Sequence, residues 1–256
     1  MAKLKMTASV VSQAQLAEGI YDLRLKAPEI ASQAAAGQFV SVYSKDGSRL
    51  LPRPISLCGI DKEAGQLRLV YRVAGAGTEE FSALKAGDTV DILGPLGNGF
   101  SLLEGKKAFL IGGGIGIPPM LQLAKELCAL NGSEMVQSVI GYRDSQLFLK
   151  DEFEAYGPVY TATEDGSRGT KGNVLNAIRE NGLTADVIYA CGPTPMLRAL
   201  KAYAAENNIQ CWISLEEKMA CGVGACLGCT CKSKNGGVSV CKDGPVFEGS
   251  VLYGLD

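Results

Sequence analysis

Residues 108–120 read Ala-Phe-Leu-Ile-Gly-Gly-Gly-Ile-Gly-Ile-Pro-Pro-Met, which is an apolar strand, a glycine-rich turn and the start of a helix. Proline suits the first turn of a helix, where no N–H group is needed. Such a turn lets the pyrophosphate of a dinucleotide approach the backbone. It departs from the G-x-G-x-x-G fingerprint, because Pro119 replaces the last small residue and no acidic ribose-binding residue follows at the usual distance. A tight turn that only packs a helix on a strand remains the alternative.

Strands and helices alternate on the C-terminal side of this turn. We expect strands at 108–111, 136–142, 158–163, 187–190 and 211–215, and helices at 118–130, 173–181 and 194–207. This alternation predicts a doubly wound α/β domain, which we assign to residues 102–211. A second loop, Cys191-Gly192-Pro193, follows a strand of this sheet, at the edge where open α/β sheets bind ligands. An ordinary strand-to-helix connection is the alternative for this loop.

The N-terminal side has a different rhythm, with short apolar segments separated by turn residues. Strands are expected at 7–11, 21–26, 38–44, 55–60, 67–73 and 89–93, which predicts an antiparallel barrel or sandwich over residues 1–101. A short helix at 79–84 interrupts this pattern. It follows Gly77-Thr78, and Arg53-Pro-Ile-Ser56 lies upstream. An arginine and a helix N-terminus together suit a pyrophosphate, although a surface charge and a plain N-cap would explain each alone.

The cysteines concentrate near the C-terminus. Cys221, Cys226 and Cys229 have the spacing C-x4-C-x2-C, and Cys241 follows at a distance. This is the plant-type [2Fe-2S] spacing, whereas zinc sites more often pair two short cysteine knuckles. A four-cysteine zinc site and ordinary buried thiols or disulfides are the alternatives. Cys231 lies outside the spacing and is assigned to packing, as are Cys58, Cys128 and Cys211. Residues 212–256 are therefore expected to form a small iron–sulfur region.

Composition excludes several classes of protein. The 256 residues contain no histidine, which removes Ser-His and Cys-His catalysis and Rieske-type ligation, so that the chemistry has to come from cofactors. The net charge is −2 and no basic run stands out, so nucleic acid is not expected as a partner. The longest apolar stretch is too short and too rich in glycine and proline to cross a membrane. No signal peptide is apparent, and a cytoplasmic location is expected.

These motifs together resemble the ferredoxin–NADP reductase superfamily, in which a flavin barrel with Arg-Pro-x-Ser precedes a nucleotide domain with Gly-Gly-Gly-x-Gly-x-x-Pro and Cys-Gly-Pro-x-Pro-Met. With the cysteine-rich tail, the chain is most similar to electron-transfer subunits of type B dihydroorotate dehydrogenases. The run that starts at Glu217 and ends at Cys229, and the later Cys241-Lys-Asp-Gly-Pro-Val-Phe247, are the most specific matches.

The resemblance implies three cofactor sites. FAD would be held by Arg53, Pro54, Ile55, Ser56, Val70, Tyr71, Arg72, Gly77 and Thr78. NAD would be framed by Gly112, Gly113, Gly114, Gly116, Cys191, Gly192 and Pro193, with Cys191 near the nicotinamide. The [2Fe-2S] cluster would be bound by Cys221, Cys226, Cys229 and Cys241.

The same resemblance implies a partner, an FMN-containing dihydroorotate dehydrogenase catalytic subunit, in a heterotetramer of two plus two. All three regions of this chain are then engaged in cofactor binding, and none is left for dihydroorotate. Two other interpretations stay open. One is the flavin and iron–sulfur subunit of another NAD(P)H–ferredoxin oxidoreductase or a hydrogenase complex. The other is a non-enzymatic regulator that binds zinc and a nucleotide.

Overall fold

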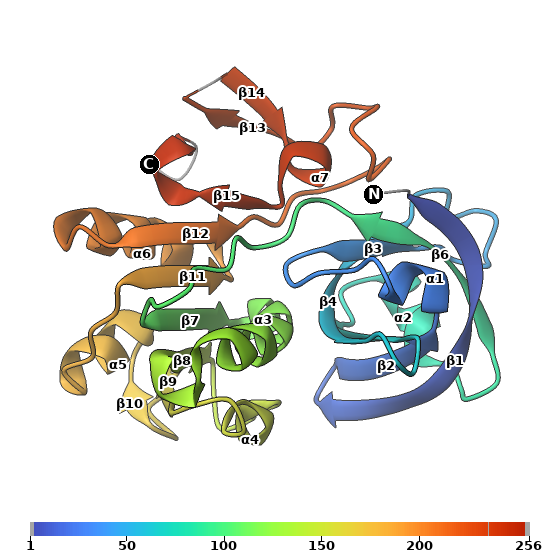
Figure 1. The fold of residues 1–256 in the computed structure, drawn as a ribbon. Coiled ribbons are helices and arrows are strands. Elements are labelled where there is room, and N and C mark those ends of the chain that lie inside the picture. The colour runs from blue at the N-terminus through green and yellow to red at the C-terminus, as the bar shows by residue number, and fades with distance from the viewer. Residues whose placement is uncertain (1–2, 235, 254–256) are drawn as a thin grey trace.

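The computed structural model describes residues 3–234 and 236–253. The chain forms a barrel, an open α/β sheet and a small C-terminal region that lies along one edge of both (Figure 1). This arrangement confirms the fold class predicted from the sequence.

The barrel is closed and antiparallel, with the strand order β1-β2-β5-β4-β3-β6. Its strands are β1 (Leu4–Ala17), β2 (Ile20–Lys26), β3 (Phe39–Val42), β4 (Arg53–Asp61), β5 (Gln66–Arg72) and β6 (Thr89–Leu96), with the short helices α1 (Pro28–Ala31) and α2 (Ala76–Ser82). The expected helix at 79–84 was placed too late, because α2 begins three residues earlier. Gly75 and Gly77 weaken the helix signal at its start, since glycine is a poor helix former.

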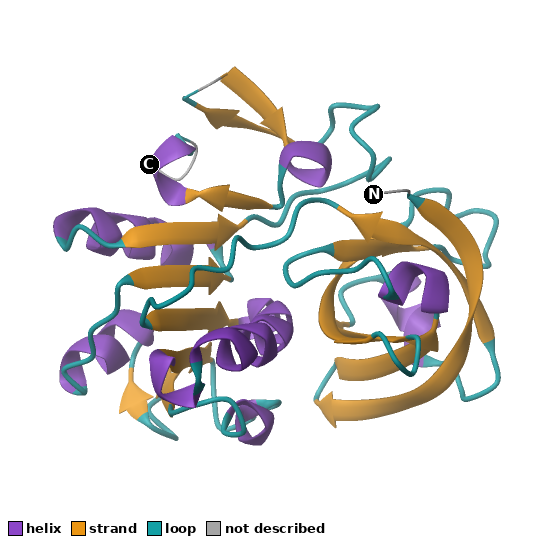
Figure 2. Ribbon diagram, in the orientation of Figure 1, coloured by secondary structure: helices purple, strands orange, loops and turns teal. Residues whose placement is uncertain are grey.

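The second part is a seven-stranded sheet of order β10-β9-β8-β7-β11-β12-β15. Strands β7 (Ala108–Gly113), β8 (Val136–Tyr142), β9 (Val159–Thr163), β10 (Thr170–Lys171), β11 (Val187–Cys191) and β12 (Gln210–Ser214) are parallel. Between them run α3 (Ile117–Asn131), α4 (Lys150–Phe153), α5 (Val174–Glu180) and α6 (Thr194–Glu206), and 3-10 turns at Gly114–Gly116 and Ser133–Met135 (Figure 2). The alternation predicted from the sequence is therefore confirmed.

The helices cover both faces of this sheet. Leu110 and Tyr189 of the sheet share one core with Leu123 of α3. Phe109 and Ile111, whose side chains point to the opposite face, share a second core with Leu200 of α6. A third core fills the barrel. Side chains that alternate along β7 are thus buried on both faces, as a parallel sheet requires.

The C-terminal region joins the nucleotide sheet through its own strand. After the hairpin β13 (Thr230–Ser233) and β14 (Gly236–Ser239) come α7 (Val240–Asp243), β15 (Val246–Glu248) and a 3-10 turn at Gly249–Val251. β15 pairs antiparallel with β12 at the sheet edge, with Ile213 opposite Phe247. The predicted division at residues 211 and 212 falls inside β12.

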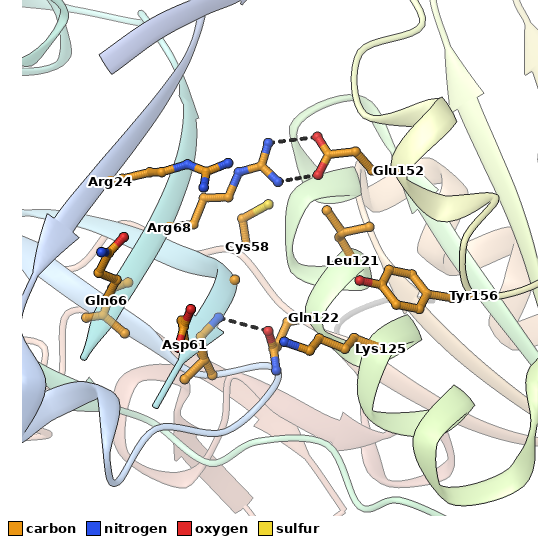
Figure 3. A pocket seen from close by; sticks show the side chains of 13 residues that line it. Arg24, Cys58, Asp61, Gln66, Arg68, Leu121, Gln122, Lys125, Glu152 and Tyr156 are labelled. Carbon is orange, nitrogen blue, oxygen red and sulfur yellow. Dashed lines mark hydrogen bonds and ion pairs between the residues drawn. The ribbon is translucent and has the colours of Figure 1, made fainter. Parts of the chain in front are cut away.

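The barrel and the sheet meet along α3, and Figure 3 looks into the cleft at one end of this contact. Arg68 of β5 forms a forked pair with Glu152 of α4, with Nη2 2.8 Å from Oε1, and also bonds to the buried carboxylate of Asp22. The backbone N–H of Ile60 donates to Oε1 of Gln122 on α3 at 2.8 Å. These bonds fix the two parts at the end of β4 away from Arg53. Within the described residues, no helix has the length and apolar character needed to cross a membrane.

Candidate cofactor-binding sites

The structure brings Arg53 and Gly77 together. Arg53 starts β4, and a Cβ placed on Gly77 would lie 2.7 Å from Nε of Arg53, so the guanidinium packs directly over the first turn of α2. The first N–H groups of a helix have no partner inside the helix. An arginine beside such groups forms the donor set that a pyrophosphate needs.

The hydroxyl group of Thr78 bonds to the backbone that precedes α2. Its Oγ1 accepts hydrogen bonds from the N–H groups of Ala74 at 2.9 Å and Gly75 at 3.2 Å, and donates to the carbonyl of Gly75. The hydroxyl therefore closes the start of α2. A phosphate at this turn would meet the backbone of Thr78.

Residues 70–72 alternate across β5. Tyr71 points into the barrel core, where it stacks on Tyr21 and meets the edge of Phe81, while its hydroxyl donates to Gln13 at 3.4 Å. Burial raises the pKa of this phenol. Val70 points outward and shares a core with residues of α3. A flavin between the barrel and the sheet would thus reach the side chains of Val70 and Arg72, but only the backbone of Tyr71. In β4, Ser56 lies between the inward-facing Ile55 and Leu57, and therefore also faces outward.

The two predicted nucleotide loops are in contact. Gly112 and Cys191 are paired across β7 and β11, so both loops start at the same edge of the sheet. A Cβ on Gly116 would lie 2.4 Å from the carbonyl oxygen of Cys191, and one on Gly113 would lie 2.6 Å from Sδ of Met196. Glycine is therefore required for the loops to approach one another, and the pair leaves a surface made mainly of backbone.

The start of α3 is poor in hydrogen-bond donors. Pro118 and Pro119 have no N–H group, and the N–H of Ile117 bonds to the carbonyl of Gly114. A pyrophosphate here would depend on the loop that precedes the helix. Gly114 has φ +53°, and a Cβ on it would meet no atom within 4 Å, so this glycine faces open space.

Cys191 is a buried neutral thiol. Burial raises its pKa, and the nearby charge of Glu216 adds to the rise, while a hydrogen bond with Ser214 opposes it. No sequence motif indicated Ser214 or Glu216. Ser214 is the last residue of β12, the neighbour of β11, and Glu216 comes two residues later, so their place at the carboxyl edge of the sheet was the signal that could have found them.

Glu216 interacts electrostatically with residues of both this edge and the barrel. Its side chain is open to solvent and lines a pocket with Gly192 and Pro193. Desolvation by the surrounding atoms nevertheless raises the pKa of its carboxyl group, and the positive charge of Arg72 partly offsets the rise. Arg72 and Cys191, predicted separately for FAD and for NAD, are therefore both close enough to interact electrostatically with one carboxyl group.

The four predicted cluster ligands gather in two pairs. The thiols of Cys221 and Cys226 contact each other, as do those of Cys229 and Cys241. Cys221, Cys226 and Cys229 come from the loop after β12, and Cys241 from α7. Among the described residues, no three histidine, cysteine or acidic side chains converge on a point suited to a single metal ion. Two pairs of thiols match a two-iron cluster, in which each iron takes two protein ligands.

Backbone N–H groups point at these sulfurs. Those of Val223, Ala225 and Cys226 lie 3.3–3.5 Å from Sγ of Cys221. Burial alone would raise the pKa of Cys221, but these hydrogen bonds and one with the thiol of Cys226 outweigh it and lower the pKa to about 6. Burial and the neighbouring Cys229 raise the pKa of Cys241 to about 12. N–H donors directed at sulfur are a feature of iron–sulfur sites, because they stabilise thiolate charge.

The cysteines outside the predicted ligand set lie elsewhere in the fold. Cys231 lies on β13 opposite Val238, and burial raises the pKa of its thiol. Cys58 and Cys211 are buried and Cys128 is half-buried, as their apolar surroundings suggested. None of the nine cysteines, all of which lie in described residues, forms a disulfide.

The cysteine loop is seated next to the flavin motif. A Cβ on Gly222 would lie 2.9 Å from Oγ of Ser41 on β3, and Ser41 pairs directly with Pro54 on β4. Neighbouring strands are about 5 Å apart. The loop that carries Cys221 is thus one strand away from the predicted flavin motif.

Three family models match consecutive parts of the chain. Residues 7–100 match an oxidoreductase FAD-binding domain, and residues 110–202 an oxidoreductase NAD-binding domain. Residues 216–253 match the iron–sulfur cluster binding domain of dihydroorotate dehydrogenase B. The three cofactors predicted from the motifs, FAD, NAD and a [2Fe-2S] cluster, agree with these matches.

Relatives match over nearly the whole length. The electron transfer subunit of dihydroorotate dehydrogenase B (NAD(+)) from Geobacillus sp. (strain WCH70) is 44% identical over 94% of this chain and 95% of its own. The subunit of the same name from Streptococcus mutans is 43% identical over 96% of each chain.

A solved structure of similar shape is an NADH-dependent reduced ferredoxin–NADP oxidoreductase, with a TM-score of 0.88, 31% identity, and coverage of 96% of this chain and 90% of that one. A ferredoxin NADP+ reductase from Neisseria gonorrhoeae, 18% identical over 79% of this chain and 91% of its own with a TM-score of 0.66, shares the fold. The chain therefore belongs to the family of electron-transfer subunits of dihydroorotate dehydrogenase B (NAD(+)).

Proposed function

We propose that this chain carries electrons between NAD and an FMN-containing catalytic subunit that oxidises dihydroorotate, in a heterotetramer of two plus two in the cytoplasm. A bound FAD can exchange a hydride with NAD and single electrons with an iron–sulfur cluster, and so couples the two. The observation that carries the proposal is the contact of the cysteine loop with Ser41, one strand from Arg53-Pro-Ile-Ser56.

We assign the binding of the three cofactors to three units, residues 1–101, 102–211 and 212–256. In the first, Arg53 and the backbone of Gly77 and Thr78 would hold the pyrophosphate of FAD. Pro54, Ile55, Ser56 and Val70–Arg72 would line the rest of that cofactor. The close packing of Arg53 on Gly77 supports this assignment.

In the second unit, the loops at 112–116 and 191–193 would orient NAD at the edge of the sheet that faces the barrel. Cys191 is buried and neutral, and therefore brings no charge to the nicotinamide. Glu216 and Arg72 would set the local charge between NAD and FAD. In the third unit, Cys221 with Cys226 and Cys229 with Cys241 would each hold one iron.

A partner is supported by the surface beside the cysteines. Leu227 lies between Cys226 and Gly228 at φ +59° and exposes 66% of its surface. A large apolar side chain held outward at a redox site suits contact with another protein. Dihydroorotate itself would bind the partner, since this chain contains no histidine to serve as a base and its three units are engaged by cofactors.

The test is reconstitution. The purified chain alone should reduce artificial acceptors with NADH and show no dihydroorotate oxidation, and addition of an FMN-bearing dihydroorotate dehydrogenase subunit should create dihydroorotate:NAD+ activity. Bleaching of the flavin by dihydroorotate in the isolated chain would contradict the proposed division of labour.

A second candidate is a subunit that serves ferredoxin, because the structure that is 31% identical belongs to an NADH-dependent reduced ferredoxin–NADP oxidoreductase. The match of residues 216–253 to the dihydroorotate dehydrogenase B domain favours the first candidate. Reduced ferredoxin supplied to the isolated chain distinguishes the two: only the second candidate predicts rapid transfer to the flavin.

A further inference from the structure

Asn98 ties the end of barrel strand β6 to the segment that follows Cys241. Its backbone N–H donates to the carbonyl of Gly244 at 2.6 Å. Its side-chain Nδ2 donates to the carbonyl of Lys242 at 3.1 Å and to that of Asp243 at 2.9 Å. One residue thus bonds to three successive carbonyls, 144 to 146 positions away in the chain.

The backbone beside Asn98 is shaped for this contact. Gly97 has φ +71°, and a Cβ on it would lie 2.5 Å from Cδ of Pro245 and 2.8 Å from the carbonyl oxygen of Gly244. Only glycine allows the two segments to approach so closely. The segment after Cys241 therefore rests directly on the barrel.

The same segment leads to the proposed cluster ligands. The N–H of Gly224 lies 3.1 Å from Sγ of Cys241, and the N–H of Cys241 lies 3.4 Å from Sγ of Cys229. The carboxylate of Asp243 accepts from the N–H of Ser239 at 2.7 Å and closes α7. A continuous set of bonds runs from β6 to these thiols.

The Asn98 side chain is suited to this place by its chemistry. A primary amide offers two N–H donors, and here they meet two neighbouring carbonyls. Aspartate has the same shape but no donor, and its charge would face carbonyl oxygens. The cysteine loop is rich in glycine, so its position against the barrel depends on a few such bonds.

We propose that Asn98 is a positioning residue, which holds the Cys241 side of the cluster at a fixed distance from the flavin on the barrel. β6 pairs with β3, and β3 pairs with the flavin motif on β4, so bonds from Asn98, two residues after the end of β6, hold the segment close to that motif. This inference rests on the proposed function. The step that it affects moves one electron from the reduced flavin to the oxidised cluster, and no covalent bond forms or breaks.

The test compares Asn98→Ala with the wild-type chain carrying both cofactors. In stopped-flow absorbance, NADH should reduce the flavin of the variant at the wild-type rate, because Asn98 lies outside the nucleotide loops. Reduction of the cluster by the flavin should slow severalfold, because the rate of electron transfer falls as the distance between the two cofactors grows. Hydrogen exchange of the amides at 240–244 should accelerate. Asn98→Asp should behave like the alanine variant.

Asn207→Ala is the matched control. Asn207 is exposed and its Nδ2 donates to the carbonyl of Tyr203 at 2.8 Å at the end of α6, so its loss should leave both reduction steps unchanged. A variant Asn98→Ala that keeps FAD and iron and reduces its cluster at the wild-type rate overturns the inference.

If the alanine variant loses iron, Asn98→Ser keeps one donor and takes its place. Wild-type transfer and wild-type hydrogen exchange in a serine variant that retains iron would equally overturn the inference. Failure of NADH to reduce the wild-type chain would instead count against the proposed function, so the two failures are distinct.

Discussion

The loops at 112–116 and 221–229 are both rich in glycine, but for different reasons. In the first, the glycines remove side chains: a Cβ on Gly116 would fall 2.4 Å from a backbone oxygen of the neighbouring loop. In the second, Gly222 and Gly224 have φ of +68° and +84°, and this curved backbone directs N–H groups at sulfur. The glycines of the first loop thus keep its surface free of side chains, whereas those of the second curve the backbone around the cysteine thiols.

This difference explains why the two loops are unequal as sequence signals. Thiolates at fixed spacing are themselves the ligands, so the pattern C-x4-C-x2-C indicates an iron–sulfur cluster directly. Glycines at a strand end only permit an approach, and the same residues serve tight turns without any ligand. Mutations should therefore remove function abruptly in the cysteine loop and gradually in the glycine loop.

The largest effect is expected from the cysteines. Serine in place of Cys226 should abolish or severely disturb the cluster, because an iron would lose one of its two thiolate ligands. Cys231→Ser is the matched control two residues beyond the ligand spacing, and its iron content should equal that of the wild-type chain. Iron analysis and visible spectra measure both. Loss of iron in the Cys231 variant would show that the ligand set is misassigned.

Arg53→Ala should have the next largest effect. The variant loses charge-assisted hydrogen bonds worth about 1.5–3 kcal/mol, which lowers the affinity for FAD by about tenfold to a hundredfold. Fluorescence of released flavin on dilution measures this affinity. Arg49→Ala is a useful control, since Arg49 pairs with Glu80 of α2, the helix whose first turn Arg53 covers. Full retention of FAD at dilute protein by the Arg53 variant would speak against the flavin site.

A smaller effect is expected when a methyl group is added to the glycine loop. Gly116→Ala forces the two nucleotide loops apart at backbone atoms, which no side-chain rotation relieves, and should destabilise the fold by about 1–3 kcal/mol and slow flavin reduction by NADH. Gly114→Ala adds the same methyl group in open space and should cost about 1 kcal/mol through its left-handed φ. Urea unfolding compares the two. Gly116→Ala should have the lower midpoint, and a lower midpoint for Gly114→Ala would refute the steric explanation.

The smallest effect concerns thiol reactivity in the iron-free chain. Cys221 and Cys231 are both half-buried, but N–H groups lower the pKa of Cys221 to about 6, whereas burial raises that of Cys231. At pH 7 the first is largely thiolate, and its lead shrinks below pH 6 as it becomes protonated. Iodoacetamide followed by mass spectrometry should therefore label Cys221 severalfold faster at pH 7. Equal rates at that pH would contradict the proposed role of the N–H groups.

The sequence predicted the parts of this molecule that local pattern controls. Turn residues between short apolar segments predicted the barrel, and the change to strand–turn–helix units predicted the sheet. Strand ends were less accurate: β1 extends to Ala17, although its expected strand ended at Val11. β15 has three residues, too few for a periodic pattern, and its place beside β12 depends on a distant pairing.

The site was predictable where residue type alone carries the chemistry. Cys221, Cys226, Cys229 and Cys241 were assigned by spacing, and the structure brings their thiols together in two pairs. Three other features depend on how distant segments pack: the direction of the Tyr71 side chain, the contact of Gly222 with Ser41 and the hydrogen bonds of Asn98. Asn98 in particular lies in Gly-Asn-Gly, which reads as an ordinary turn, and only its three carbonyl partners distinguish it.

An anaerobic titration of the purified chain with NADH tests the central claim most directly. A hydride supplies two electrons, the flavin accepts two and the cluster one, so full bleaching of both should need about 1.5 equivalents of NADH. The same chain should remain oxidised when dihydroorotate is added instead. An endpoint near one equivalent with the cluster still oxidised, or bleaching by dihydroorotate alone, would contradict the claim that this chain is an electron relay between NAD and a separate catalytic subunit.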